Sequence, residues 1–135
     1  IKITVGTAIV TPDTDRTMDI RGRDLVSGLP KTLTIRAKEI REALNEPIYK
    51  IIDAVKGTLE KTPPELAADV MDHGIMMTGG GALLMNLDKL LSHETGMPVL
   101  VSEEALSCVG EGTGRTLENI GLLKNVVMSS KKLKQ

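Results

Sequence analysis

The segment most able to bind a ligand is "TGGGA" at residues 78–82. It follows the short apolar run "IMMT" (75–78) and precedes an apolar-periodic segment, so it joins an expected strand to an expected helix. Glycine loses more conformational entropy on folding than any other residue, and a turn requires only one or two glycines. Two interpretations therefore stay open: a sharp turn without a ligand, or bare backbone that a ligand approaches, as at strand ends in open α/β sheets.

A second glycine cluster, "GEGTGR", occupies residues 110–115. Gly110 and Gly114 are four residues apart and share one face of a helix, where missing side chains permit close packing. The preceding residues "ALSCV" are helical in pattern, so we favour packing over a phosphate loop. Neither cluster matches the Gly-Lys-Ser/Thr ending of a P-loop or the G-x-G-x-x-G dinucleotide fingerprint.

The other titratable and nucleophilic residues give no recognisable site. Paired carboxylates lack a His or Lys at a spacing suited to acid–base work, and the hydroxyl and thiol candidates lack a base partner. The histidines lack the Cys/His spacing of a zinc site. These residues are Glu103 with Glu104, Asp69 with Asp72, Ser107, Cys108, His73 and His93.

The composition of the 135-residue chain is that of one soluble globular domain, with 41% hydrophobic and 26% charged residues. The formal net charge is −1 and Tyr49 is the sole aromatic residue, which argues against nucleic acid as a partner because neither charge attraction nor base stacking is available. Cys108 is the single cysteine, so no intrachain disulfide can form. No apolar run is long enough to span a bilayer.

Residues 1–35 predict β structure. "IKITVGTAIV" (1–10) alternates in strand fashion, and "TMDIRGRDL" (17–25) and "LPKTLTI" (29–35) are separated by turn residues. We expect antiparallel hairpins with one covered face. Because the chain begins in such a strand without Met, we interpret it as a fragment or a trimmed domain.

The hydrophobic period becomes helical near residue 38. Pro47 interrupts the stripe, so either the helix kinks or Asn45 ends one helix and Pro47 begins another. In "TPPE" (62–65), Thr62 is the expected N-cap, and Glu65 closes a capping box on a helix that ends near Gly74. The stripe consists of Ile40, Ala43, Leu44, Ile48, Ile51, Ile52, Val55 and Leu59.

The remainder predicts a β-α-β-α order around a buried parallel sheet. The expected strands are 75–78 and 97–101, and a helix over about 84–94 lies between them. A glycine-rich helix over 105–120 and a terminal helix over 122–128 follow.

Several segments together resemble the bacterial actin homologue MreB and its paralogues, over nearly the whole chain. The blocks "TPPEL" and "TGGGALL" are specific in combination, whereas sugar kinases and heat-shock 70 chaperones share only the glycine turn. The segments are "RGRDLVSGLPKTLTI", "EIREAL", "LEKTPPELAADVMDHGI", "TGGGALL.NLDKLL", "ETGMPV" and "CV..GTG..LEN".

The resemblance implies an α/β fold: an actin-like, RNase H-like ATPase lobe with a mixed sheet and helices, and a small β-containing subdomain at the N-terminus. This chain resembles the C-terminal lobe, with residues 1–37 in the small upper subdomain (IIB) and 38–135 in the RNase H-like subdomain (IIA). The glycine turn corresponds to the adenosine motif of the family. The "GEGTG" segment corresponds to the pivot between lobes, with Gly110, Gly112 and Gly114 in hinge or packing roles. The implied adenosine-side residues are Thr78, Gly79, Gly80, Gly81, Ala82 and Leu83.

The resemblance also implies the function of the whole protein: a cytoplasmic, Mg-ATP-dependent filament at the inner face of the cell membrane that organises cell-wall synthesis and rod shape. Its implied partners are other copies of itself, a RodZ-type membrane adaptor and the cell-wall elongation machinery. Membrane contact would come through an N-terminal lobe absent from this sequence. The Asp-x-Gly-Thr phosphate loop and the catalytic carboxylate are also absent, so we expect no ATP hydrolysis by this chain alone. The alternatives are a stand-alone nucleotide or small-molecule module and a pure interaction domain.

Overall fold

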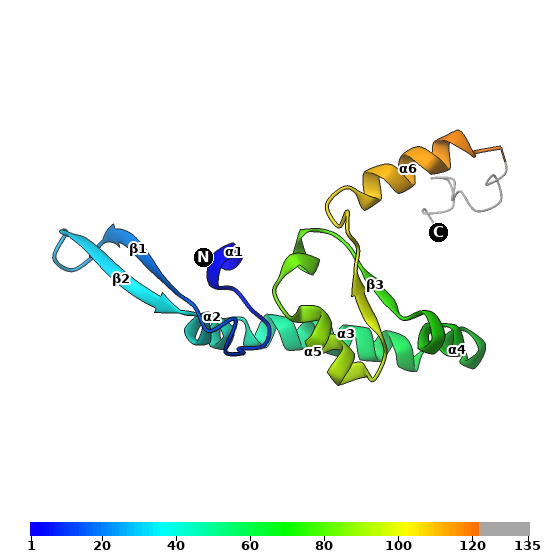
Figure 1. Cartoon of the computed structure of the whole chain (residues 1–135), viewed down its shortest axis with the longest axis horizontal. Helices are drawn as coiled ribbons and strands as arrows, with labels where there is room; N and C mark the ends of the chain where they lie inside the picture. The colour runs from blue at the N-terminus through cyan, green and yellow to red at the C-terminus, as the bar shows by residue number, and fades with distance from the viewer. Residues whose placement is uncertain (122–135) are drawn as a thin grey trace, which may run out of the picture.

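A computed structural model describes residues 1–121. The long helix α3 (Asn45–Glu60) forms the base of the molecule. A β-hairpin projects from one end of the long axis, and α4 (Pro64–His73) lies at the other end (Figure 1). The helix α6 (Cys108–Glu118) extends away from this base. The remaining elements are α1 (Lys2–Val5), β1 (Thr17–Arg23), β2 (Pro30–Arg36), α2 (Ala37–Ala43), β3 (Ile75–Met77), the 3₁₀ helix η1 (Gly80–Leu83), α5 (Leu87–Thr95) and β4 (Val99–Val101).

The N-terminal segment corrects the prediction of a strand over residues 1–10. Lys2–Val5 forms one helical turn, in which Val5 N–H donates to the Ile1 carbonyl at 2.9 Å. Thr7 then makes a single parallel bridge to Met85, and Ala8 N–H donates to the Met85 carbonyl at 2.8 Å. A single turn is too short to show a helical period. The backbone partner at residue 85 is remote in sequence, so the local pattern could not reveal it.

The β1–β2 hairpin confirms the antiparallel prediction, with register from Thr17 opposite Arg36 to Arg23 opposite Pro30. The expected covered face is confirmed only in part among the described residues. Met18, Ile20 and Ile35 are half-buried, but the Leu33 side chain is 50% exposed. The hairpin forms a separate two-stranded sheet, so neither of its faces receives a full layer.

The helical stripe divides at Leu44, which caps both α2 and α3. The structure thus has two helices rather than one kinked helix, with the break at Leu44 instead of between Asn45 and Pro47. Pro47 occupies the third position of α3, where its missing N–H would have no partner within the helix.

The helix α4 corrects the capping prediction. Its N-cap is Pro63, no side-chain cap bond forms, and the Thr62 hydroxyl donates to the Thr58 carbonyl at 2.8 Å. Thr62 is thus bonded to the last turn of α3. The predicted end near Gly74 is confirmed, with Gly74 as C-cap at φ +81.

The strands β3 and β4 confirm the parallel pair, with Ile75 opposite Val99 and Met77 opposite Val101. Their expected full burial is wrong among the described residues, since Met76 is 59% and Leu100 52% exposed. This sheet has two strands in the described part of the chain, and one of its faces has no covering layer.

The core lies where α3 and α5 meet under β4. Apolar side chains about one turn apart on each of these helices pack together there, and the hydrophobic effect is the main driving term. A salt bridge of 2.7 Å between Lys56 Nζ and Glu94 Oε2 spans the two helices at the edge of the core. The hydrogen bond raises the pKa of Lys56 and lowers the pKa of Glu94. The core residues are Ala8, Ile48, Ile52, Leu87, Leu90, Leu91 and Val99.

The helix expected over 84–94 begins three residues later, at Leu87. Leu84 is extended and Met85 pairs with Thr7, so these two residues cannot join the helix. Asn86 is the N-cap in the left-handed region (φ 60), and its amide donates to the Ile9 carbonyl at 3.1 Å. The predicted glycine-rich helix over 105–120 is confirmed as Cys108–Glu118, and the predicted terminal helix (122–128) lies outside the described residues.

Candidate functional site

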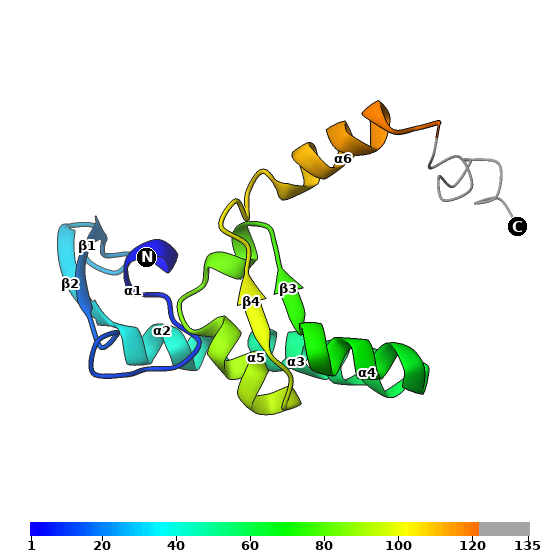
Figure 2. The ribbon, with the colours of Figure 1, turned by 45° about the vertical axis from the view of Figure 1, so that its right-hand side comes forward.

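The glycine turn joins the C-terminal end of β3 to η1, at the sheet end where β4 also finishes (Figure 2). Thr78 leaves the strand, Gly79 turns the chain, and Gly80 begins the 3₁₀ helix. Gly79 N–H donates to the Ala105 carbonyl at 2.6 Å, and the Gly79 carbonyl accepts from Ala82 N–H at 3.1 Å. The turn is therefore fixed on both sides by backbone hydrogen bonds.

The three glycines have different physical reasons for lacking a side chain. Gly79 has φ +83 and ψ 169, a conformation that residues other than glycine rarely adopt. A Cβ on Gly80 would meet Leu106 Cδ2 at an ordinary 3.6 Å, and a Cβ on Gly81 would meet nothing within 4 Å. The described fold therefore requires glycine at position 79. No contact within the described chain explains why positions 80 and 81 are also glycine.

Most of the predicted adenosine-side residues are exposed to solvent, and one of them is buried. Thr78, Gly80, Gly81 and Leu83 are exposed, with Leu83 at 54%. Ala82 is 5% exposed and points into the protein, so only its backbone could reach a ligand. The turn thus offers bare backbone with Thr78 at one end and an apolar side chain at the other.

The loop after β4 forms a second wall that sequence reasoning missed. Ser102 N–H donates to the Met77 carbonyl at 3.0 Å, which holds this loop against the end of β3. Ala105 is buried and bonds to Gly79, and Leu106 is 75% exposed beside Gly80. A signal was available, because parallel strands end at the same edge of a sheet and the loops after β3 and β4 therefore meet.

Gly110, Gly112 and Gly114 lie on α6, and all three are exposed. A Cβ on any of them would meet nothing within 4 Å in the described part of the chain. Their predicted packing or hinge role stays a prediction, because no described element contacts this helix face closely.

The other candidates form no reactive arrangement among residues 1–121. Ser107 Oγ donates to Glu111 Oε1 at 2.7 Å, and Cys108 Sγ lies 2.9 Å from Ser102 Oγ. Neither is bonded to an imidazole or an amine in this range, and no cluster of three metal-binding side chains occurs in it. No helix within this range has the length and apolar character to cross a membrane. Two cavities in the described part of the chain, of about 890 and 690 Å³, are lined by other elements than the glycine turn.

A sequence model of the family described as MreB/Mbl protein matches residues 1–125. The chain belongs to the MreB/Mbl family. It is 52% identical over 124 residues to the cell shape-determining protein Mbl of Bacillus subtilis, a match that covers 91% of this chain and 37% of that protein. It is 48% identical over 122 residues to the cell shape-determining protein MreB of Escherichia coli K12, covering 90% and 35%.

Solved MreB structures agree with this assignment. The fold matches MreB5 of Spiroplasma citri bound to ADP with a TM-score of 0.82 and 43% identity, over 88% of this chain and 36% of that one. It matches the same protein bound to AMPPNP with a TM-score of 0.81 and 41% identity, over 93% and 38%. The chain thus spans little more than a third of the MreB/Mbl relatives it matches.

Proposed function

We propose that this chain is the C-terminal lobe of an actin-like, ATP-binding and filament-forming protein that directs cell shape and cell-wall synthesis. Family membership supports the general function, and the share of the relatives that the chain covers fits a single lobe. Residues 1–37 belong to the small upper subdomain on this proposal, and residues 38–135 to the RNase H-like subdomain. The hairpin, separate from the β3–β4 sheet, suits such a division.

The observation that best supports nucleotide binding is that neither Gly80 nor Gly81 is required by the described fold itself. Gly80 and Gly81 have room for a side chain in the described fold, yet the chain presents bare backbone there, beside exposed apolar side chains. This open backbone fits a flat nucleoside lying against the turn. The adenosine end of ATP would contact the backbone of Thr78–Ala82 together with the Leu83 side chain.

Phosphate chemistry would depend on residues outside this chain. The sequence contains no Asp-x-Gly-Thr block, and phosphoryl transfer depends chiefly on positioning and on stabilising charge at the phosphates. The 135-residue chain alone is therefore expected not to hydrolyse ATP. When Mg-ATP is bound in the full-length protein, the metal and the missing loops supply that chemistry, and the glycine turn binds and orients the nucleoside.

The proposed setting is the cytoplasm, at the inner face of the cell membrane. The proposed partners are other copies of the protein in protofilaments, a RodZ-type membrane adaptor and the cell-wall elongation machinery, with membrane contact through the other lobe. The exposed glycines of α6 would pack at the pivot between the two lobes. Packing at the pivot would explain why this helix contains three glycines although no described residue packs against them.

The decisive experiment is a nucleotide titration of the full-length protein carrying Gly80→Val. The added side chain should weaken ATP binding by about tenfold or more, which corresponds to about 1.4 kcal/mol or more. Gly22→Val in β1 is the matched control, because its Cβ also meets nothing within 4 Å and it lies far from the turn. An unchanged dissociation constant for Gly80→Val, with a native unfolding transition, would refute nucleotide binding at this turn.

A further inference from the structure

Asn86 is the only residue other than glycine with a positive φ in the described part of the chain, at φ 60 and ψ 15. This left-handed backbone is unfavourable for most side chains, whereas glycine adopts it without strain. Asn86 is also the N-cap of α5, where an asparagine side chain ordinarily bonds to the first N–H groups of the helix, yet it makes no such bond here. Neither the backbone conformation nor helix capping therefore accounts for this side chain.

The Asn86 side chain instead holds a segment that is remote in sequence. Its Nδ2 donates to the Ile9 carbonyl at 3.1 Å and to Thr7 Oγ1 at 3.4 Å. Beside these bonds, Ala8 N–H donates to the Met85 carbonyl at 2.8 Å. Thr7 and Ala8 are both 0% exposed, and hydrogen bonds shielded from water are stronger than exposed ones. The start of α5 and this segment thus form one hydrogen-bonded contact, which we call the α5 junction.

The α5 junction directly follows the glycine turn in the chain. Leu83, the last residue of η1, precedes Asn86 by three residues. Leu84 N–H donates to the Gly81 carbonyl at 3.2 Å, and Leu87 N–H donates to the Leu84 carbonyl at 3.1 Å. Backbone hydrogen bonds therefore connect the turn to the first residue of α5. A nucleoside that orders Gly81 and Leu83 restrains the position of Asn86 as well.

The segment on the other side of the α5 junction, residues 7–16, leads directly into the β1–β2 hairpin. The Ala8 carbonyl also accepts from Arg41 Nε of α2. The carbonyl of Arg16, next to the first residue of β1, accepts from Ala37 N–H at 2.9 Å. The base of the hairpin is thus attached through this segment and through the start of α2, so the position of the segment helps to set the position of the hairpin.

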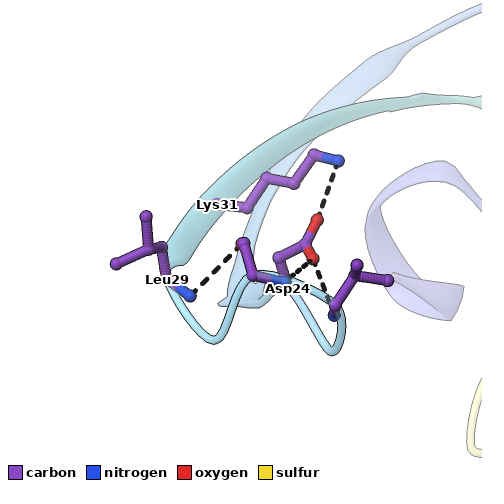
Figure 3. Close-up of polar contacts among 5 residues, drawn as sticks. Asp24, Leu29 and Lys31 are labelled. Atoms are coloured by element: carbon purple, nitrogen blue, oxygen red, sulfur yellow. Dashed lines mark hydrogen bonds and ion pairs between the residues drawn. The ribbon is translucent and has the colours of Figure 1, made fainter.

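The hairpin is braced internally at its tip by Asp24 (Figure 3). Asp24 Oδ1 accepts from the N–H groups of Val26 and Ser27 at 2.9 Å each, and Oδ2 pairs with Lys31 Nζ at 3.1 Å. Asp24 N–H also donates to the Leu29 carbonyl at 2.9 Å. A hairpin braced in this way keeps its shape when its base moves, so a change at the base reorients the whole element.

We propose that Asn86 is a positioning residue that couples ATP binding at the glycine turn to the docking of residues 7–16, and hence to the placement of the hairpin. The Asn86 amide bonds are made when the segment is docked on α5 and are broken when it opens locally. A ligand shifts such an equilibrium only through its different affinity for the two states, and the amide bonds supply that difference. The coupling is reciprocal, so a docked segment also strengthens ATP binding. This inference rests on the proposed nucleotide binding and names the residue that transmits it.

Hydrogen exchange of single amides in the full-length protein tests the coupling, with and without ATP and below the concentration at which the protein pellets. ATP should slow exchange of the Ala82 and Leu84 N–H groups beside the turn. It should also slow exchange of Ala8 N–H in the α5 junction by about fivefold, the lower end of typical couplings. Asn86→Gly keeps the left-handed backbone and removes the amide, so it should abolish the slowing at Ala8 and retain it at Ala82 and Leu84.

Two further variants separate the amide from general effects on the helix. Asn86→Asp keeps the shape of the side chain but replaces the donor with a carboxylate oxygen, so it should behave like Asn86→Gly. Thr95→Ala is the matched control, because it removes a hydrogen bond of 2.7 Å to the Leu91 carbonyl at the other end of α5. Both Asn86 variants should also bind ATP about fivefold more weakly, since the coupling is reciprocal, and Thr95→Ala should bind it like the wild type.

The outcomes separate the coupling from the proposed function. A merely structural Asn86 would speed exchange at Ala8 equally with and without ATP, so an unchanged ratio of the two rates in Asn86→Gly overturns the coupling. Slowing at Ala82 and Leu84 but not at Ala8 in the wild type also overturns it and leaves nucleotide binding at the turn standing. No slowing at any of the three amides refutes both the binding at the turn and the coupling.

Discussion

Gly79 and Gly81 provide a paired test of how the glycine turn is built. Replacing Gly79 with alanine forces a side chain onto backbone at φ +83 and ψ 169, which should lower the free energy of unfolding by about 1–3 kcal/mol. Replacing Gly81 with alanine adds a Cβ that meets nothing within 4 Å at a φ outside the left-handed region. It should change stability by less than about 0.5 kcal/mol, or raise it slightly by restricting the unfolded chain.

Urea unfolding of the full-length protein, followed by circular dichroism, measures both variants. The Gly79→Ala protein should show a lower midpoint with an unchanged slope, and Gly81→Ala should overlay the wild type. ATP titration should show that Gly81→Ala binds ATP more weakly than the wild type, although the stability of this variant is normal. Equal unfolding midpoints for the two variants would refute the assignment of the turn conformation to Gly79.

Two further predictions concern stability. Gly74→Ala should destabilise the protein more than Gly79→Ala. The φ of Gly74 is +81, and the new Cβ would also lie 2.7 Å from the Pro98 backbone oxygen. A urea midpoint equal to that of the wild type would contradict this prediction. The Lys56–Glu94 pair should stabilise the fold between the two ordinary pKa values of 10.5 and 4.5. Its contribution should vanish as acid protonates Glu94 below the lowered pKa, or as base deprotonates Lys56 above the raised one. The difference in urea midpoint between wild type and Lys56→Met, measured against pH, checks this, and a difference independent of pH would contradict it.

Most of the helices, the parallel strand pair and two helix ends could be predicted from the sequence, because apolar spacing and the backbone preference of glycine determine them locally. The apolar spacing from Ile48 to Leu59 produces α3, and the short apolar runs around residues 75–77 and 99–101 produce the parallel pair. The positive φ of Gly74 and Gly96 at two helix ends follows the usual glycine preference. The glycine turn and the blocks around it also sufficed for the family resemblance, which the comparisons bear out.

Only the tertiary structure decided features that depend on residues far apart in the chain. The pairing of Thr7 with Met85 turned an expected strand into a bridge and delayed the start of α5. The bond from Gly79 to Ala105 created the second wall of the candidate site. Periodicity reports which residues prefer burial, but the partner that covers each residue is selected by long-range contacts. Sequence alone therefore located the three glycines, and the fold distinguished the one that shapes the turn from the two that leave it open.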